Sequence, residues 1–247
     1  MNVRRMNARR KICAVVPVKD TRDAKQRLAG VLDRARRQEL ALAMLEDVLA
    51  ALAAVSELAG ILVVTVDPAA AAIASRHGAD VASDGARDSH TGAVAAAARA
   101  LAAEGLDMLA VPGDIPLVEP DDIRRLIRAH GTHRGAFTIV PARDERGSNA
   151  VLCSPAGAVG LRFGENSFLP HLAAARACGI EPRVVALPRI ALDIDTPDDL
   201  ALLLEVASRS RASALLERWR LRSGHDLGRD SGLDSGLDSG LGIKASA

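Results

Sequence analysis

Short, continuous apolar runs that alternate with helical patterns constrain the fold of this chain most strongly. Three such runs, each bounded by polar residues, occupy residues 12–18, 61–66 and 108–111. A strand has this appearance when helices cover both faces of its parallel sheet. Segments with helical spacing or many alanines follow the runs, at residues 34–54, 69–77, 91–103 and 119–129. This alternation predicts an α/β protein with one mostly parallel central sheet and helices on both faces.

The second half of the chain continues the pattern less regularly. Strands are predicted at residues 80–82, 136–140, 150–153 and 183–186, and a helix at 167–178. A last helix of this part should begin after Thr196 and run to about residue 205, because Thr196 suits the cap and Pro197 the first turn.

Length and composition exclude several classes of protein. A chain of 247 residues can bury a large core without disulfides or a structural metal. Its formal net charge of +1 argues against a general nucleic-acid binder. An apolar stretch of about 20 residues, which a membrane span requires, is absent. The three cysteines match no metal-binding spacing and are interpreted as reduced, small hydrophobic residues, which predicts a cytoplasmic protein.

Composition also divides the chain into segments. We expect one domain over residues 11–207, preceded by a disordered basic lead-in at residues 1–10. Residues 208–222 are basic and predict a helical extension. Residues 223–247 contain repeats of Asp-Ser-Gly-Leu and are predicted to be disordered, because a segment this rich in glycine, serine and aspartate cannot bury a core.

Basic residues follow the first predicted strand. In an open parallel sheet, ligands bind beyond the carboxyl ends of the strands. Lys19, Arg22, Lys25 and Arg27 lie in the loop at such an end and could hold the oxygens of a triphosphate. The alternative is a solvated charged loop. The phosphate-binding motifs GxxxxGK[ST] and GxGxxG do not occur in the chain.

Acidic residues follow two later strands or extended segments. Asp114 lies between Pro112 and Pro116 and is a candidate ligand for Mg²⁺, although an aspartate in a turn can also cap backbone amides. Asp193 and Asp195 are two positions apart in an extended segment. Because side chains of such a segment point to the same side at every second residue, the two carboxylates should lie on one side. The pattern favours a ligand role for Asp193 and a supporting role for Asp195 at the following helix.

Two segments of small polar residues complete the candidate site. Residues 146–150 and 162–168 offer hydroxyls and backbone amides, and the second leads into a predicted helix. Amides at a helix N-terminus bind phosphates and carboxylates. Together the segments would suit a small phosphorylated acid, and the alternative is a pair of ordinary turns.

Taken in order, these segments resemble the 2-phospho-L-lactate guanylyltransferase family of coenzyme F-420 biosynthesis, which belongs to the GT-A-like nucleotidyltransferases. The resemblance covers about residues 12–204. Its matching stretches are Val16–Lys19 with Lys25–Leu28, Val63–Asp67, Val111–Leu117, Gly147–Ala150, Phe163–Phe168 with His171, and Asp193–Leu200.

The resemblance implies that the phosphate of a small phospho-acid attacks the α-phosphorus of GTP and that pyrophosphate leaves. It implies Mg²⁺ as the cofactor and functional coupling to the downstream transferase, while the charge balance and the lack of a long apolar stretch predict no nucleic-acid or membrane partner. By position, Lys19 and Lys25 would be catalytic and would bind the nucleotide together with Arg27 and Thr91. Ser148, Gly164 and Ser167 would bind the acid, and Asp114, Asp193 and Asp195 would bind Mg²⁺.

Two departures from the family pattern concern substrate choice. Ser148 replaces the usual threonine but keeps the hydroxyl, and residues 89–92 differ from the usual Leu-Asn sequence. Members use 2-phospho-L-lactate, phosphoenolpyruvate or 3-phospho-D-glycerate, and these residues do not distinguish among them. Alternative hypotheses are another nucleotidyltransferase of this fold, of the molybdopterin or sugar-phosphate type, and a non-catalytic nucleotide-binding module. A glycine-rich loop after the first strand would favour the former, but the first glycine there is Gly30.

Overall fold

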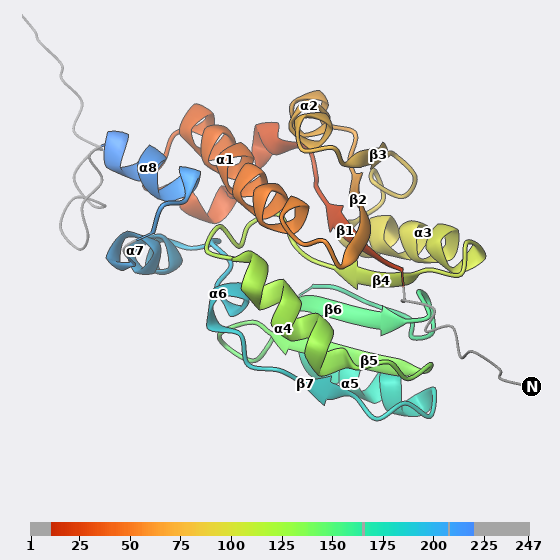
Figure 1. The fold of residues 1–247 in the computed structure, drawn as a ribbon. Coiled ribbons are helices and arrows are strands. Elements are labelled where there is room, and N and C mark those ends of the chain that lie inside the picture. The colour runs from red at the N-terminus through yellow and green to blue at the C-terminus, as the bar shows by residue number, and fades with distance from the viewer. Residues whose placement is uncertain (1–10, 165, 207, 220–247) are drawn as a thin grey trace, which may run out of the picture.

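A seven-stranded sheet forms the centre of the structure, a computed structural model that describes residues 11–164, 166–206 and 208–219 (Figure 1). Its strands have the spatial order β3-β2-β1-β4-β6-β5-β7. They are β1 (Ile12–Pro17), β2 (Leu58–Val64), β3 (Asp80–Ala82), β4 (Asp107–Ala110), β5 (Ala136–Pro141), β6 (Ser148–Ser154) and β7 (Arg183–Val184).

Strand β6 is the antiparallel member of this sheet. It pairs antiparallel with both β4 and β5, whereas the pairs β1–β2, β1–β4, β2–β3 and β5–β7 are parallel. In the β4–β6 register, Ala110 faces Val151. The first residues of β6 therefore lie at the same edge of the sheet as the last residues of β4.

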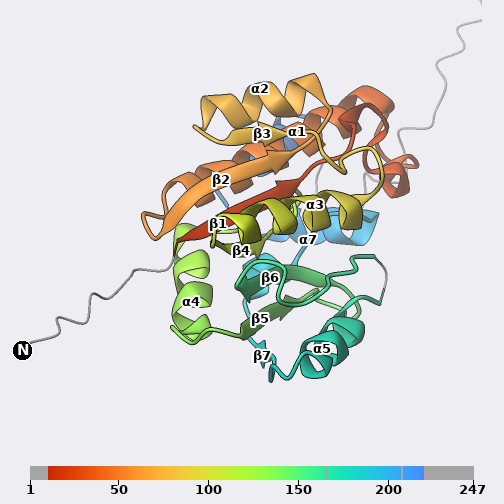
Figure 2. The same cartoon turned by 90° about the vertical axis from the view of Figure 1, so that its right-hand side faces the viewer.

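Helices cover both faces of the sheet, as predicted (Figures 1 and 2). One face packs against α1 (Arg34–Ala53), α2 (Pro68–Arg76), α4 (Pro120–His130) and the short α6 (Pro188–Ala191). The opposite face packs against α3 (His90–Ala103) and α5 (Phe168–Ala177). Alternate residues of β1 serve the two cores: Ala14 and Val16 face α1, and Val15 faces α3.

The last two helices, α7 (Pro197–Glu205) and α8 (Arg211–Arg218), lie at one end of the molecule (Figure 1). Leu200 of α7 and Leu216 of α8 are buried in one cluster with Leu40 and Met44 of α1. The buried Asp47 of α1 accepts hydrogen bonds from the amides of Arg211 and Ala212, and so caps α8.

Most predicted elements are present within one or two residues of the expected bounds. Asp33 caps α1 and Thr196 caps α7, as expected. Three elements had no sequence prediction: α6 and two short 3₁₀ helices at Thr21–Asp23 and Gln26–Leu28. The predicted lead-in at 1–10, residues 220–222 of the extension and the tail at 223–247 lie outside the described residues.

The burial of the cysteines and the length of the helices test two of the expectations drawn from composition. Cys13 and Cys153 are buried, as expected, but Cys178 is exposed, so packing as a small hydrophobic residue is wrong for that position. Its place at the end of α5 leaves it outside the core. None of the helices in the described ranges is both long and apolar enough to cross a membrane.

We expect Gly85→Ala to destabilise the protein more than Gly78→Ala. Both glycines have a positive φ, 73° and 68°, where an alanine costs about 1 kcal/mol. At Gly78 a Cβ would meet open space, whereas at Gly85 it would clash with the backbone oxygen of Gly92 in α3. This clash should cost about 2 kcal/mol more, measured by urea unfolding. Equal losses would show that the loop before α3 yields freely.

Candidate active site

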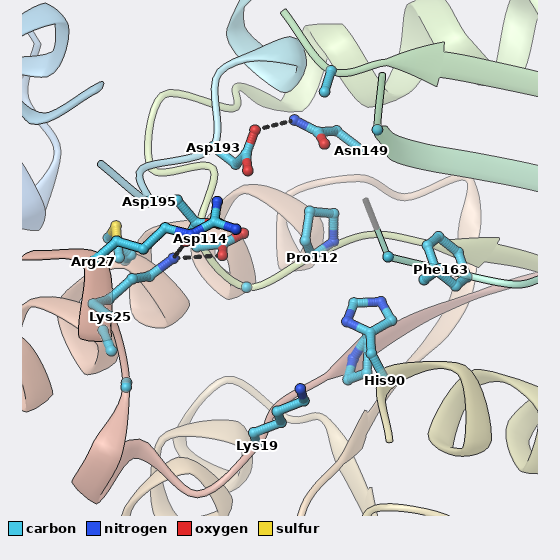
Figure 3. Close-up of a pocket in the computed structure, with 18 of the residues that line it drawn as sticks. Lys19, Lys25, Arg27, His90, Pro112, Asp114, Asn149, Phe163, Asp193 and Asp195 are labelled. Carbon is cyan, nitrogen blue, oxygen red and sulfur yellow. Dashed lines mark hydrogen bonds and ion pairs between the residues drawn. The ribbon is translucent and has the colours of Figure 1, made fainter. Parts of the chain in front are cut away.

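A cleft of about 1000 Å³ opens beyond the carboxyl ends of β1 and β4. Its lining includes all ten candidate residues, which come from segments far apart in the sequence: Lys19, Lys25, Arg27, Thr91, Asp114, Ser148, Gly164, Ser167, Asp193 and Asp195. The close-up in Figure 3 shows Lys25 and Arg27 beside Asp114 and Asp195, with Lys19 and His90 at another side of the cleft. The structure therefore brings the predicted set together, while the role of each residue stays a prediction.

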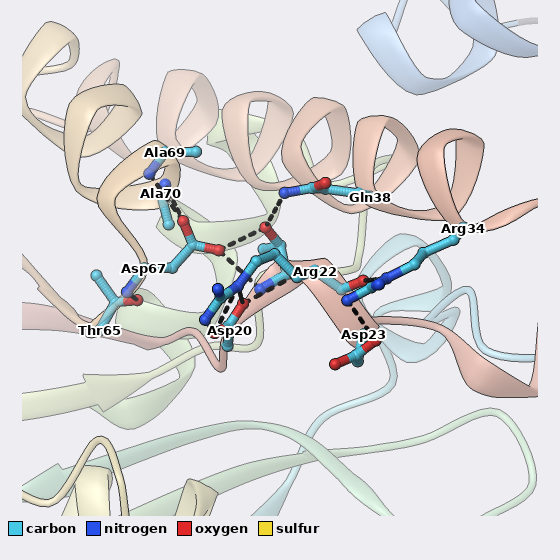
Figure 4. Close-up of polar contacts among 10 residues, drawn as sticks. Asp20, Arg22, Asp23, Arg34, Gln38, Thr65, Asp67, Ala69 and Ala70 are labelled. Atoms are coloured by element: carbon cyan, nitrogen blue, oxygen red, sulfur yellow. Dashed lines mark hydrogen bonds and ion pairs between the residues drawn. The ribbon is translucent and has the colours of Figure 1, made fainter.

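The loop after β1 is fixed by a buried carboxylate at the end of β2 (Figure 4). Asp67 accepts hydrogen bonds from the amide and the hydroxyl of Thr21, and also from the amides of Ala69 and Ala70. Burial alone would raise the pKa of Asp67, but these hydrogen bonds hold it below its usual value. One charged side chain thus caps α2 and anchors the basic loop to the sheet.

Lys25 is buried between two carboxylates. Its Nζ lies 2.6 Å from Asp114 Oδ2 and 2.6 Å from Asp195 Oδ1, and its side chain is 8% exposed. Burial opposes its charge, but the two carboxylates raise the pKa of Lys25 above its usual value, so it stays protonated. The backbone of Lys25 has a φ of 53°, in the left-handed region that non-glycine residues rarely adopt. Such strain at a cleft is typical of a functional position.

The side chain of Asp195 pairs with Lys25 in the cleft and does not cap the following helix, α7. The capping box of α7 is formed by Thr196 and Asp199, whose carboxylate accepts the amide of Thr196 at 2.9 Å. The supporting role that the residue pattern favoured for Asp195 is therefore wrong, because neighbouring side chains already satisfy that helix end. Burial would raise the pKa of Asp195, but Lys25 lowers it below its usual value.

Asp193 is held by an asparagine on β6. The Asn149 amide nitrogen donates to Asp193 Oδ1 at 2.9 Å (Figure 3). It also donates to the backbone oxygens of Ile190 and Ala191. Burial and the nearby Asp114 raise the pKa of Asp193. Asn149 thus fixes the segment that carries Asp193 against the sheet.

Lys19 and His90 lie together on another wall of the cleft (Figure 3). Within the described part of the chain, Lys19 has no ion-pair partner, so its charge is available to a ligand. Burial lowers the pKa of His90; the nearby Asp114 opposes this shift, and Lys19 adds to it. The ring of His90 lies 4.7 Å from that of Phe163, measured between centroids.

Thr91 fastens the start of α3 to the segment before α5. Its hydroxyl accepts the amide of Phe163 at 3.0 Å and donates to the Phe163 oxygen at 3.2 Å. The proton of this hydroxyl and one of its two lone pairs are therefore used within the protein. Thr91 lines the cleft, and in this arrangement it holds the loop that carries Gly164 in place.

The small polar residues meet at the start of β6. Ser148 and Ser167 are both buried, and Ser167 Oγ donates to Ser148 Oγ at 3.4 Å. Behind them lies His171 of α5, whose Nδ1 is 2.9 Å from Ser148 Oγ and whose Nε2 accepts the amide of Arg162. Gly164, with a φ of 139°, lines the same end of the cleft.

The carboxylates fit a divalent metal that is shared with phosphates. Asp114 Oδ1 is buried and has no hydrogen-bond partner in the described structure, which is the state expected of a ligand atom. In the described ranges, no three histidine, cysteine or acidic side chains are grouped closely enough to hold a metal by themselves. Mg²⁺ usually takes one or two carboxylates and completes its shell with phosphate oxygens and water.

Sequence reasoning gave no role to three residues that build this site: Asn149, His171 and Asp67. Asn149 is polar within an apolar strand, and that contrast could have identified it. His171 and Asp67 carry weaker signals, because their partners are distant in the chain and only the fold brings them together.

His171 should make stability depend on pH. Burial lowers its pKa to about 4 from 6.5, so between these values the unfolded chain binds a proton that the folded protein does not. The contribution of the neutral His171 to the free energy of unfolding is therefore complete above pH 6.5 and is lost as the pH falls toward 4. Between about pH 7 and about pH 5, wild type should lose about 2 kcal/mol more than His171→Gln in urea unfolding. Parallel pH profiles would contradict this.

Comparison with known families gives one match over most of the chain. The model of the family described as "Guanylyl transferase CofC like" matches residues 12–228. Phosphoenolpyruvate guanylyltransferase of Roseiflexus castenholzii is 39% identical over 211 residues, which cover 85% of this chain and 96% of that protein. The protein of the same name from Rubrobacter xylanophilus is 41% identical over 197 residues, covering 78% and 93%.

Solved structures agree on the fold. A 4-diphosphocytidyl-2C-methyl-D-erythritol synthase from Anaerococcus prevotii superposes with a TM-score of 0.56 at 12% identity, over 85% of this chain and 99% of that one. A nucleotidyl transferase from Methanothermobacter thermautotrophicus gives a TM-score of 0.53 at 17% identity, over 84% and 99%. At these identities the likeness concerns the nucleotidyltransferase fold.

Proposed function

The chain belongs to the CofC-like guanylyl transferase family, and on this premise we propose that it joins GMP from GTP to phosphoenolpyruvate with release of pyrophosphate. The enzyme class is that of a nucleotidyltransferase. Phosphoenolpyruvate is chosen among the small phospho-acids because the relatives from Roseiflexus and Rubrobacter carry that substrate in their names.

The separation of charge within one cleft is the observation that carries this proposal. Lys19, which has no ion-pair partner among the described residues, offers a cation on one wall, while Asp114, Asp193 and Asp195 gather on another. A triphosphate needs cations around its oxygens, and a divalent metal that bridges those oxygens needs carboxylates. The cleft supplies both kinds of group at the carboxyl ends of β1 and β4, where ligands bind in open α/β sheets.

The reaction is a displacement at phosphorus. An oxygen of the acceptor's phosphate forms a bond to the α-phosphorus of GTP, and the bond from that phosphorus to the bridging oxygen breaks. Pyrophosphate leaves with the electron pair. Most of the catalysis in such a reaction comes from positioning and charge stabilisation. Lys19 would bind the triphosphate, and Arg27, which lines the cleft near Asp195, would add a second cation.

Lys25 would have two roles, first as the partner of two carboxylates and then as a ligand of phosphate oxygens. In the free protein it neutralises Asp114 and Asp195. With a divalent metal held by these carboxylates, the Lys25 ammonium would no longer be needed to neutralise them and would be available to phosphate oxygens of the nucleotide. The predicted role of Lys25 in binding the nucleotide thus requires this exchange of partners.

Mg²⁺ would be held by Asp114 and Asp193, with Asp195 as a third candidate. When bound, it would balance the negative charge of the phosphates. The acceptor acid would lie at the other end of the cleft, where the Ser148 hydroxyl and the backbone amides at Gly164 and Ser167 would offer neutral donors to its phosphate or carboxylate.

The product would be a phosphoanhydride, which is reactive toward water. We propose that a downstream transferase consumes it promptly, in the cytoplasm, where GTP and the acid are available.

The test is a pyrophosphate-release assay with purified protein and Mg²⁺. GTP, ATP and CTP are each paired with phosphoenolpyruvate, 2-phospho-L-lactate and 3-phospho-D-glycerate, and the downstream transferase is added where the anhydride decays. We expect release with GTP and phosphoenolpyruvate. A sugar phosphate is included as a further acceptor, and release with CTP and the sugar phosphate would assign another nucleotidyltransferase activity. If no pair releases pyrophosphate, the proposed enzymatic activity is wrong.

A further inference from the structure

The protonation pattern of His171 follows from its surroundings. In a neutral imidazole one ring nitrogen donates and the other accepts. The Arg162 backbone amide, which can only donate, lies 2.9 Å from His171 Nε2, so this nitrogen is the acceptor. The hydrogen is therefore on Nδ1, and it is donated to Ser148 Oγ at 2.9 Å. Burial, with 1% of the residue exposed, favours the neutral ring.

This donation determines what Ser148 can do. A serine hydroxyl has one proton to donate and two lone pairs to accept with. Ser148 Oγ accepts from His171 at 2.9 Å and, in a longer and weaker contact of 3.4 Å, from Ser167, so both lone pairs face donors within the protein. Its own proton has no acceptor among the described residues, and the cleft is the open direction for it.

We propose that His171 is a positioning residue that holds Ser148 Oγ as an acceptor and thereby turns the Ser148 proton into the cleft, toward an anionic oxygen of the acceptor acid. The inference rests on the proposed function and adds a determinant of specificity to it. Since Ser148 offers this site a donor and no acceptor, this end of the cleft would favour a ligand oxygen that accepts, above all an ionised phosphate or carboxylate oxygen, over a group that only donates, such as an ammonium.

A double-mutant cycle tests the coupling. His171→Gln keeps an acceptor for the Arg162 amide, because the Gln amide oxygen can take the place of Nε2, but it removes the donor to Ser148. We expect this variant and Ser148→Ala each to raise the KM for phosphoenolpyruvate about tenfold and to leave the KM for GTP within about twofold. The double variant should be no worse than Ser148→Ala alone, since the two residues act through one hydrogen bond.

Matched variants separate this role from a structural one. His171→Asn places its amide nitrogen near the former Nδ1 and should restore most of the affinity for the acid, although it cannot accept from Arg162. Arg176→Gln, on the exposed far end of α5, controls for a change in the same helix and should leave both KM values unchanged. Nitrogen chemical shifts of His171 in the wild-type protein report the tautomer directly.

The outcomes distinguish the inference from the proposed function. If wild type releases no pyrophosphate, the proposed function fails, and dissociation constants for phosphoenolpyruvate from calorimetry complete the same cycle. An Nε2-protonated His171, an unchanged KM in His171→Gln, or multiplying effects in the double variant would each overturn the inference. So would a wild-type protein that does not bind the acid at all.

Discussion

Replacing Asp114 with asparagine is expected to lower GTP-dependent pyrophosphate release by about a hundredfold to a thousandfold. Asp114 lies beyond the end of β4, where Oδ2 pairs with Lys25 and the buried Oδ1 has no partner in the described structure. The amide keeps the size of the side chain but lacks the charge that a divalent metal requires. Turnover is measured at saturating GTP and acid over a range of Mg²⁺ concentrations, and the concentration of Mg²⁺ for half-maximal rate should rise.

Asp121→Asn is the matched control, because it removes the same charge from the exposed start of α4, where Asp121 pairs with Arg124. This variant should keep the wild-type rate. Asp114→Asn itself should unfold like the wild-type protein within about 1.5 kcal/mol, since the change conserves volume and Lys25 keeps Asp195. An Asp114→Asn enzyme with nearly intact turnover would remove Asp114 from the metal site.

Much of the fold follows from the apolar runs. The run that forms β1 is buried along its whole length, which is the condition that makes a strand continuously apolar. The position of the cleft follows as well, because parallel strands present their carboxyl ends at one edge. This is why Lys19 and Asp114, from the loops after β1 and β4, could be placed in one site from the sequence.

The ion pairs and hydrogen bonds within the site could not be predicted in the same way. A sequence shows that Lys25 is basic and Asp195 acidic, but not that they form an ion pair across the cleft. Spacing near a helix also misled the assignment of Asp195, because Thr196 and Asp199 were able to cap α7 without it. Likewise, the donor character of Ser148 depends on His171, 23 positions away. Such properties arise from contacts between distant segments.

Lys25→Met should lower both stability and activity, and Mg²⁺ should restore part of the stability. Without the ammonium, Asp114 and Asp195 face each other in a partly buried site with no cation between them. We expect a loss of about 2 kcal/mol in urea unfolding and a fall in turnover of at least about a hundredfold.

The metal response separates this cause from simple loss of packing. If Lys25 occupies the charge position that a bound divalent ion would fill, Mg²⁺ without nucleotide should raise the melting temperature of Lys25→Met more than that of wild type, because the ion no longer competes with the lysine. Arg34→Met is the control: Arg34 pairs with Asp23 at 3.0 Å on the exposed side of the same loop, so its loss should cost less than about 1 kcal/mol. Equal Mg²⁺ responses in the three proteins would mean that the Lys25 pair and the metal use different groups, and the exchange of partners proposed for Lys25 would then be wrong.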